Sequence, residues 1–190
     1  MAPIPVLEQY PEKALLDDGT EVKIRPLVPE DKIPLLKSFE QLPETDRFYL
    51  KENVTSPEVI YRWTEEMDQD RVLPLVAVVN GKIVADGSLH RSRSRALRLI
   101  GEVRIVVDPY YRQRGLGTRL VQELINIATD LRLEKLMLEL VDRREDAAVK
   151  MAEKMGFRTV AILPGRIKDM FGASQDLVIM EKLIEPAKQN

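Results

Sequence analysis

Two arginines and two glycines lie together in the stretch Arg112 to Thr118, between an apolar run and a helical pattern. Residues 103–107 form a short β-branched run, which predicts a buried strand that ends at Pro109. Beyond the glycines, leucines and isoleucines recur at helical spacing, so a helix is expected to begin near Gly115. The first N–H groups of a helix lack partners, and the helix dipole is positive there. The stretch is therefore predicted to bind an anion, and the expected anion is a phosphate.

The chemistry of this stretch favours a pyrophosphate. Gly115 and Gly117 lack a Cβ, so the backbone can approach a phosphate closely, and Arg112 and Arg114 add positive charge. A Walker A loop is excluded because no Lys-Ser/Thr pair follows, and the G-x-G-x-x-G dinucleotide loop is excluded by the residues after Gly117. The alternative is a helix start with flexible glycines.

Glu102 is a candidate general base, because it is a carboxylate at the start of an otherwise apolar strand. Burial there would raise its pKa toward the working range of a base. In the alternative interpretation Glu102 pairs with Arg104 or Arg98 and has no chemical role, and the sequence pattern alone favours that alternative. His90, the only histidine, is a second candidate base, with a hydrogen-bonded strand histidine as the alternative.

The elements that must position these residues alternate between strands and helices, so the fold class is α/β (α+β), a mixed, mostly antiparallel sheet flanked by helices. A β-hairpin is predicted around Asn80-Gly81, and a capping box of Asp142 and Glu145 is predicted to begin a helix that Gly156 ends. The remaining predicted elements are a strand at 21–26, helices at 29–40 and from Ser56, strands at 75–79, 82–90, 135–141, 157–163 and 176–184, and a loop at 164–172 that covers the site.

Length and composition limit the remaining possibilities. The 190 residues fit one domain over 18–185, with an N-terminal arm at 1–17 and a tail at 186–190. The 29 basic and 31 acidic residues leave a net charge of −2, which gives no general attraction to nucleic acid or to a membrane. Without cysteine there is no disulfide and no cysteine nucleophile, and the longest apolar run is too short to span a bilayer. We expect a cytoplasmic protein. The sequence leaves open whether it forms a homodimer.

The stretch Arg112-Gln113-Arg114-Gly115-Leu116-Gly117 resembles the R/Q-x-x-G-x-G/A acyl-CoA loop of the GNAT N-acetyltransferases. The likeness extends from Asp18 to Ile184 and includes the helix that closes on Met155-Gly156-Phe157. Within the family, Asp18-Gly19, residues 24–27 and 29–31, and Gly101-Glu102 resemble the catalytic domain of bacterial Pat-type protein lysine acetyltransferases.

The resemblance implies a GNAT fold with six to seven strands and a splay between the central strand and the next one, where acetyl-CoA enters as cosubstrate. It implies transfer of the acetyl group to a primary amine by direct attack, with Glu102 as general base and without a metal. The residues expected to contact the cofactor are Ile105, Val106 and Val107 through their backbone, then Arg112, Gln113, Arg114, Gly115, Leu116, Gly117, Thr118 and Glu145.

Two positions depart from the wider family pattern. Ala152 stands where many members have a tyrosine that protonates the leaving thiolate, and Glu145 stands where many have an asparagine. Since a coenzyme A thiol has a pKa not far above 8, its thiolate can leave without an acid. The lysine acetyltransferase branch resembles this chain in lacking the tyrosine.

The acceptor amine is expected to be a protein lysine. The alternatives are a small amine, such as a polyamine, an amino acid or an aminoglycoside, and a non-catalytic acyl-CoA sensor. Phe48, Tyr49, Tyr61 and Trp63 are candidate lining residues of the acceptor pocket, with ordinary packing favoured for each.

Overall fold

The computed structural model describes residues 7, 9–142 and 144–185. Among these residues, eight strands form one sheet in the order β1-β2-β3-β4-β5-β6-β8-β7. Every neighbouring pair is antiparallel except β5 and β6, which are parallel. The mixed, mostly antiparallel sheet is confirmed, with eight strands in place of the six to seven expected.

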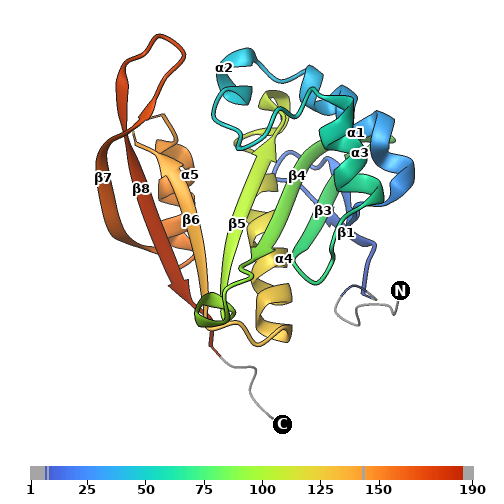
Figure 1. Cartoon of the computed structure of the whole chain (residues 1–190). Coiled ribbons are helices and arrows are strands. Elements are labelled where there is room, and N and C mark those ends of the chain that lie inside the picture. The colour runs from blue at the N-terminus through green and yellow to red at the C-terminus, as the bar shows by residue number, and fades with distance from the viewer. Residues whose placement is uncertain (1–6, 8, 143, 186–190) are drawn as a thin grey trace.

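The elements follow one another in the order shown by the colours of Figure 1. The strands are β1 (Glu12–Leu15), β2 (Glu21–Pro26), β3 (Val72–Val79), β4 (Lys82–Arg91), β5 (Ile100–Val107), β6 (Lys135–Val141), β7 (Arg158–Lys168) and β8 (Ser174–Leu183). The α-helices are α1 (Lys32–Glu40), α2 (Glu44–Arg47), α3 (Pro57–Glu65), α4 (Leu116–Asp130) and α5 (Asp146–Lys154), with short 3₁₀ turns at Pro29–Asp31, Arg95–Leu97 and Pro109–Tyr111.

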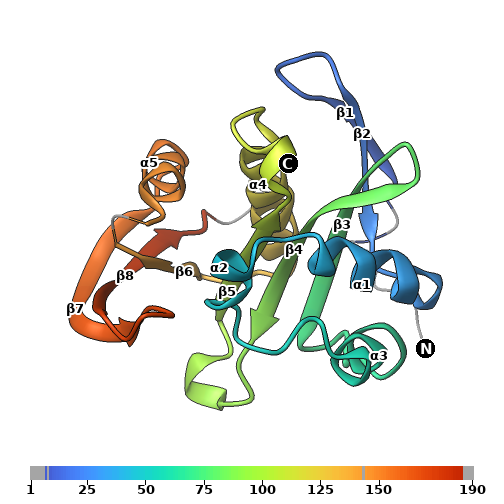
Figure 2. The ribbon, with the colours of Figure 1, turned by 90° about the horizontal axis from the view of Figure 1, so that it is seen from above.

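The helices cover both faces of the sheet. Figure 2 shows α4 and α5 on one side and α1 and α3 on the other. The larger core lies under α4, where Leu120 and Leu124 are fully buried against strand residues such as Leu89. The smaller core lies under α1 and α3, with Phe39 and Ile60 at its centre. No helix of the described ranges is long and apolar enough to cross a membrane.

Local sequence signals account for several element boundaries. Asn80 and Gly81 both have positive φ, 49° and 77°, as the predicted type I′ turn requires. Gly156 ends α5 with a φ of 87°, and Pro34 lies in the first turn of α1, where a missing N–H is harmless.

Three predictions about elements are wrong. Residues 12–15 of the expected arm form β1, which pairs with β2 through residues 21–24. The expected loop 164–172 is mostly strand, because β7 continues through a register shift between Leu163 and Ile167. The predicted capping box of Asp142 and Glu145 does not begin the helix, because α5 begins at Asp146 with Glu145 as its N-cap residue.

Candidate active site

The central strand β5 parts from β6 beside Glu102. Parallel pairing of the two strands joins only residues 100–102 to residues 135–137 and ends at Glu102 and Met137. Beyond that point the ribbons of β5 and β6 diverge (Figure 1). Ile105, Val106 and Val107 pair with β4 on their other side. The expected splay is therefore confirmed, and the backbone edge of residues 105–107 that faces β6 is free of β-ladder bonds to it.

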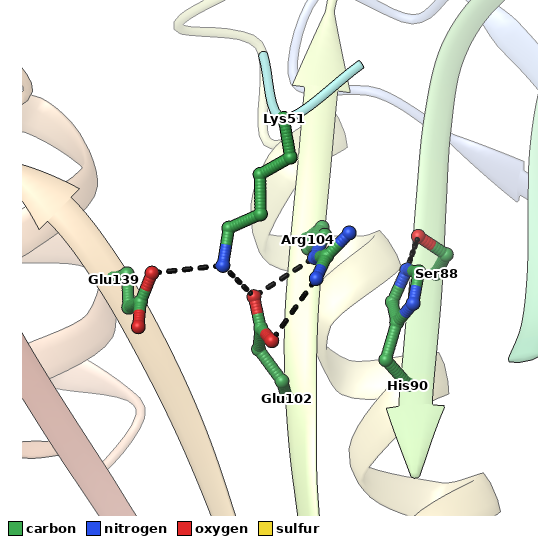
Figure 3. Close-up of polar contacts among 6 residues, drawn as sticks. All are labelled: Lys51, Ser88, His90, Glu102, Arg104 and Glu139. Atoms are coloured by element: carbon green, nitrogen blue, oxygen red, sulfur yellow. Dashed lines mark hydrogen bonds and ion pairs between the residues drawn. The ribbon is translucent and has the colours of Figure 1, made fainter. Parts of the chain in front are cut away.

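Glu102 lies on β5 among cationic partners (Figure 3). Its carboxylate accepts two hydrogen bonds from Arg104, from Nε at 2.8 Å and from Nη2 at 3.1 Å. The ammonium of Lys51 donates to Glu102 Oε1 at 2.6 Å and to Oε2 of Glu139 at 2.8 Å. One ammonium group thus bridges carboxylates from the two strands that diverge.

The pKa of Glu102 corrects an expectation from the sequence. Burial alone would raise this pKa, but the hydrogen bonds and charges of Arg104 and Lys51 outweigh burial and lower the pKa to about 2. The alternative that pairs Glu102 with Arg104 is confirmed as a contact. A carboxylate at this pKa is a weak proton acceptor, so Glu102 becomes a stronger base only when a cation leaves it.

His90 stands opposite Glu102 in the pairing of β4 with β5. Its Nε2 lies 2.9 Å from Oγ of Ser88, so the hydrogen-bonded strand histidine is confirmed as a contact. Burial and the nearby charge of Arg104 lower the pKa of His90 to about 4, which leaves the ring neutral at pH 7.

The glycine-bearing loop begins α4 as the sequence predicts. Gly115 is the N-cap residue and has a φ of 82°, a left-handed conformation that glycine adopts without strain. Gln113 also has a positive φ, 57°. Leu116 is buried in the larger core and anchors the first turn, while a Cβ added at Gly117 would meet only Val107 Cγ2, at 3.9 Å. The N–H groups at Gly117 and Thr118 are therefore at the open start of a long helix.

Acidic side chains hold both arginines of this loop. Arg114 Nη1 lies 2.6 Å from Asp18 Oδ2, and Arg112 Nη2 lies 2.6 Å from Asp46 Oδ2. Asp46 also accepts from Arg144 at 2.5 Å, so this one carboxylate of α2 joins the segment after β5 to the segment after β6. We call the set Asp46, Arg112 and Arg144 the arginine clasp.

Glu145 turns back toward its own chain. Its Oε2 accepts from the backbone N–H of Val141 at 2.5 Å, and burial raises its pKa. The carboxylate thus holds the end of β6 against the start of α5, next to the arginine clasp. Ala152 is fully buried in the larger core.

The four aromatic candidates have three kinds of surroundings. Trp63 packs edge-on against Phe39 with ring centroids 5.9 Å apart, which makes it a core residue. Tyr61 lies under Lys32 Nζ, and Tyr49 lies under the guanidinium of Arg144. Phe48 and Lys51 both line a pocket of about 480 Å³ formed by residues 44–55.

Sequence reasoning missed four polar residues of this region: Lys51, Asp86, Arg144 and Glu139. Asp86 is a charged residue inside the apolar part of β4, and this interruption could have been noticed in the sequence. Burial raises its pKa to about 7, and it lines a small pocket with Phe39 and Asp108. Lys51 gave no signal in the sequence, because it reaches Glu102 across 51 residues of chain.

Comparison with known proteins shows the family of this chain. The family model of the GNAT acetyltransferases matches residues 36–157. The phosphinothricin acetyltransferase-like protein YwnH of Bacillus subtilis is 31% identical over 126 residues, which cover 66% of this chain and 76% of that protein.

Solved structures share the fold. A GNAT acetyltransferase from Streptococcus pneumoniae superposes with a TM-score of 0.77 at 26% identity, covering 86% of this chain and 99% of that one. The GNAT domain of S. lividans PAT superposes with a TM-score of 0.75 at 19% identity over 96% of this chain and 99% of that domain, and at this identity it shows the fold alone. This chain belongs to the GNAT acetyltransferase family and is an N-acetyltransferase that uses acetyl-CoA as its cosubstrate.

Proposed function

We propose that the acceptor is a primary amine whose ammonium group lies between Glu102 and Glu139, and that Glu102 is the general base of the transfer. One observation carries this proposal: the ammonium of Lys51 already occupies that position, 2.6 Å from Glu102 and 2.8 Å from Glu139. A primary ammonium at the end of an alkyl chain therefore fits the site. An external acceptor takes the place of Lys51, whose side chain is 44% exposed.

The chemistry of this arrangement follows from proton transfer. An amine with a pKa near 10 is protonated at pH 7 and has no lone pair for attack. Glu102 accepts the proton as the amine attacks the thioester carbonyl, and displacement of Lys51 increases its basicity. The N–H of Asp108 donates to Val84 of β4, and alternate residues of a strand present their backbone groups to opposite edges, so the N–H groups of Ile105 and Val107 face the splay. These two groups are placed to meet the developing oxyanion.

The bound acetyl-CoA is proposed to lie in the splay, with its pyrophosphate against residues 112–118. The left-handed Gly115, the open space over Gly117 and the start of α4 fit a pyrophosphate. Arg112 and Arg114 would exchange Asp46 and Asp18 for phosphate oxygens. Glu145 supports cofactor binding indirectly, because it holds the segment after β6 in place. The family resemblance implied a direct contact with the cofactor.

A lysine side chain of a protein is the acceptor that we favour, because the group found in the site is itself a lysine ammonium. A small amine that carries an anionic group is the second candidate. Two observations favour it. The positive charges of Arg104 and Arg71 both lower the pKa of His90, which pairs with Glu102, so positive charge gathers near the site. The buried Nε of Arg71 also has no hydrogen-bond partner. The name of the relative YwnH also refers to a small-molecule acceptor.

An acceptor panel distinguishes the two candidates. Lysine peptides, polyamines and amino acids would each be incubated with acetyl-CoA, and release of the coenzyme A thiol would be followed. We expect transfer to lysine peptides, and Glu139→Gln to raise the KM of the amine about tenfold through loss of one charged contact. The matched control is Glu134→Gln, on the exposed turn before β6. An equal KM for wild type and Glu139→Gln would contradict the proposed ammonium site.

We also propose a homodimer that buries the edge strand β7. Val160 and Ile162 are 54% and 56% exposed on this strand, and β7 ends the sheet. Light scattering of the wild type and of Ile162→Lys would test it, with a change from dimer to monomer as the expected result.

A further inference from the structure

Lys51 occupies the place that the proposed function assigns to the acceptor amine. It belongs to the segment between α2 and α3, which lies outside any helix or strand. Its ammonium contacts the carboxylate of Glu102, the last paired residue of β5, and that of Glu139 on β6, two residues past the last pair (Figure 3). The nucleophilic atom is thus at the mouth of the splay, where the thioester of acetyl-CoA is proposed to lie.

Other lysines with defined contacts have different surroundings. Lys13 pairs with Glu21 at the far end of the sheet, and Lys135 pairs with Glu181. Among the residues that the structure describes, Lys51 is the only lysine paired with Glu102. A reaction that depends on Glu102 would therefore select Lys51 over its neighbours.

We propose that the enzyme acetylates its own Lys51, an inference that rests on the proposed function of the same site. The ammonium of Lys51 gives one proton to Glu102, and the neutral amine attacks the thioester carbonyl. The new bond joins Nζ to the acetyl carbon, the carbon–sulfur bond breaks, and its electron pair leaves with the sulfur. The nitrogen loses its second proton to the departing thiolate, and the proton on Glu102 passes to water, so one proton is released overall. The products are N-acetyl-Lys51 and coenzyme A.

The modification has a consequence for the acceptor site. An acetamide carries no charge, so Glu102 and Glu139 lose the cation that they share. The pKa of Glu102 then rises, because only Arg104 still opposes the effect of burial. Self-acetylation thus frees the ammonium site and increases the basicity of the general base, so the modified enzyme has a higher affinity for an external amine.

Mass spectrometry tests the modification. The full chain would be incubated with acetyl-CoA and no acceptor, then digested and mapped. We expect close to one acetyl group per chain at Lys51, while Lys13 stays at the level set by uncatalysed acetylation. Glu102→Gln should slow the modification about 100-fold, and Lys51→Arg, which keeps the positive charge, should remove it. An equal rate in Glu102→Gln, or equal labelling of Lys13, would overturn the proposal.

A second readout is taken with no acetyl-CoA in the sample. The pKa of the Glu102 carboxyl would be followed by NMR in the protein before acetylation and after it, once coenzyme A has been removed. A rise is the expected result, and an unchanged pKa would mean that Lys51 does not control this carboxylate.

The acceptor panel separates this inference from the proposed function. Transfer to an external amine while Lys51 remains unmodified would overturn self-acetylation alone. Absence of transfer to every amine and to Lys51 would overturn both proposals.

Discussion

The ammonium of Lys51 lies 2.6 Å from Oε1 of Glu102, although the two residues are 51 positions apart in the chain. The contact comes from a loop on one side and the central strand on the other. It neutralises the candidate base in the resting enzyme, and together with Arg104 it lowers the pKa of Glu102 to about 2.

This relationship predicts how Lys51→Ala changes the titration of Glu102. The pKa should rise from about 2 toward its ordinary value of 4.5, because Arg104 remains as the only direct cationic partner. Carboxyl resonances in a pH titration by NMR would measure it. Lys13→Ala is the matched control, since Lys13 pairs with Glu21 away from the site, and a titration unchanged by Lys51→Ala would be inconsistent with the contact.

The same depressed pKa has a consequence for stability. The pKa is lower in the folded chain, so the stabilisation from Glu102 is complete above pH 4.5 and is lost as pH falls toward 2. Wild type should therefore lose more of its unfolding free energy over this window than Glu102→Gln does. Urea unfolding at a series of pH values would measure the difference, and parallel curves for both proteins would argue against the prediction.

Gly117 should be the position in the loop that is most sensitive to charge. A Cβ there has room, 3.9 Å from Val107, so Gly117→Ala should fold and bind acetyl-CoA within a few fold of wild type. Gly117→Glu puts a carboxylate against the proposed pyrophosphate site and should weaken binding by about 100-fold or more. Calorimetric titration of acetyl-CoA into the three proteins would show it, and similar affinities for Ala and Glu would place the pyrophosphate elsewhere.

The arginine clasp should compete with the cofactor. Asp46→Asn frees Arg112 and Arg144 from a carboxylate that is only partly buried, so acetyl-CoA affinity should increase about two- to fivefold, the size expected for a solvent-screened ion pair. Glu21→Gln removes the same charge away from the loop and serves as control. A weaker affinity for Asp46→Asn would mean that the clasp assists binding.

Gly101 allows the strand to pack beside Glu102. A Cβ at this position would lie 2.6 Å from Leu89 Cδ1 and 2.9 Å from both Leu133 and Leu136, so Gly101→Ala should destabilise the fold by about 1–3 kcal/mol. At Gly87 the nearest atom would be 3.5 Å away, an ordinary contact, so Gly87→Ala is the control. Denaturant unfolding of both variants measures the difference in stability. Equal stabilities would show that the three leucines move to make room for the added Cβ.

Much of the fold could be predicted because its signals are local. The turn at Asn80-Gly81, the end of α5 at Gly156 and the start of α4 at Gly115 each depend on a residue whose backbone preferences are visible in the sequence. The position of Glu102 at the start of the central strand followed from the apolar, β-branched run of residues 103–107, and the splay after it followed from the family resemblance.

The electrostatics of the site could not be predicted, because they depend on contacts between distant segments. Burial of Glu102 could be predicted, but the direction of its pKa shift depends on Arg104 and also on Lys51, and the loop that carries Lys51 has no periodic pattern. Asp46 reaches Arg112 across 66 residues, and no local rule joins the two. The strand β7 was underestimated since Pro164 and Gly165 signal a loop, whereas the structure accommodates them in an irregular register on an edge strand.

The most direct test of the central claim is the effect of Glu102→Gln on transfer and on cofactor binding in one preparation. Thiol release with the best amine of the panel gives kcat/KM, and calorimetry gives the affinity for acetyl-CoA. We predict a loss of kcat/KM of about 100-fold or more with unchanged acetyl-CoA affinity, as expected for removal of a general base. Full activity in Glu102→Gln would contradict the assignment of Glu102 as the base.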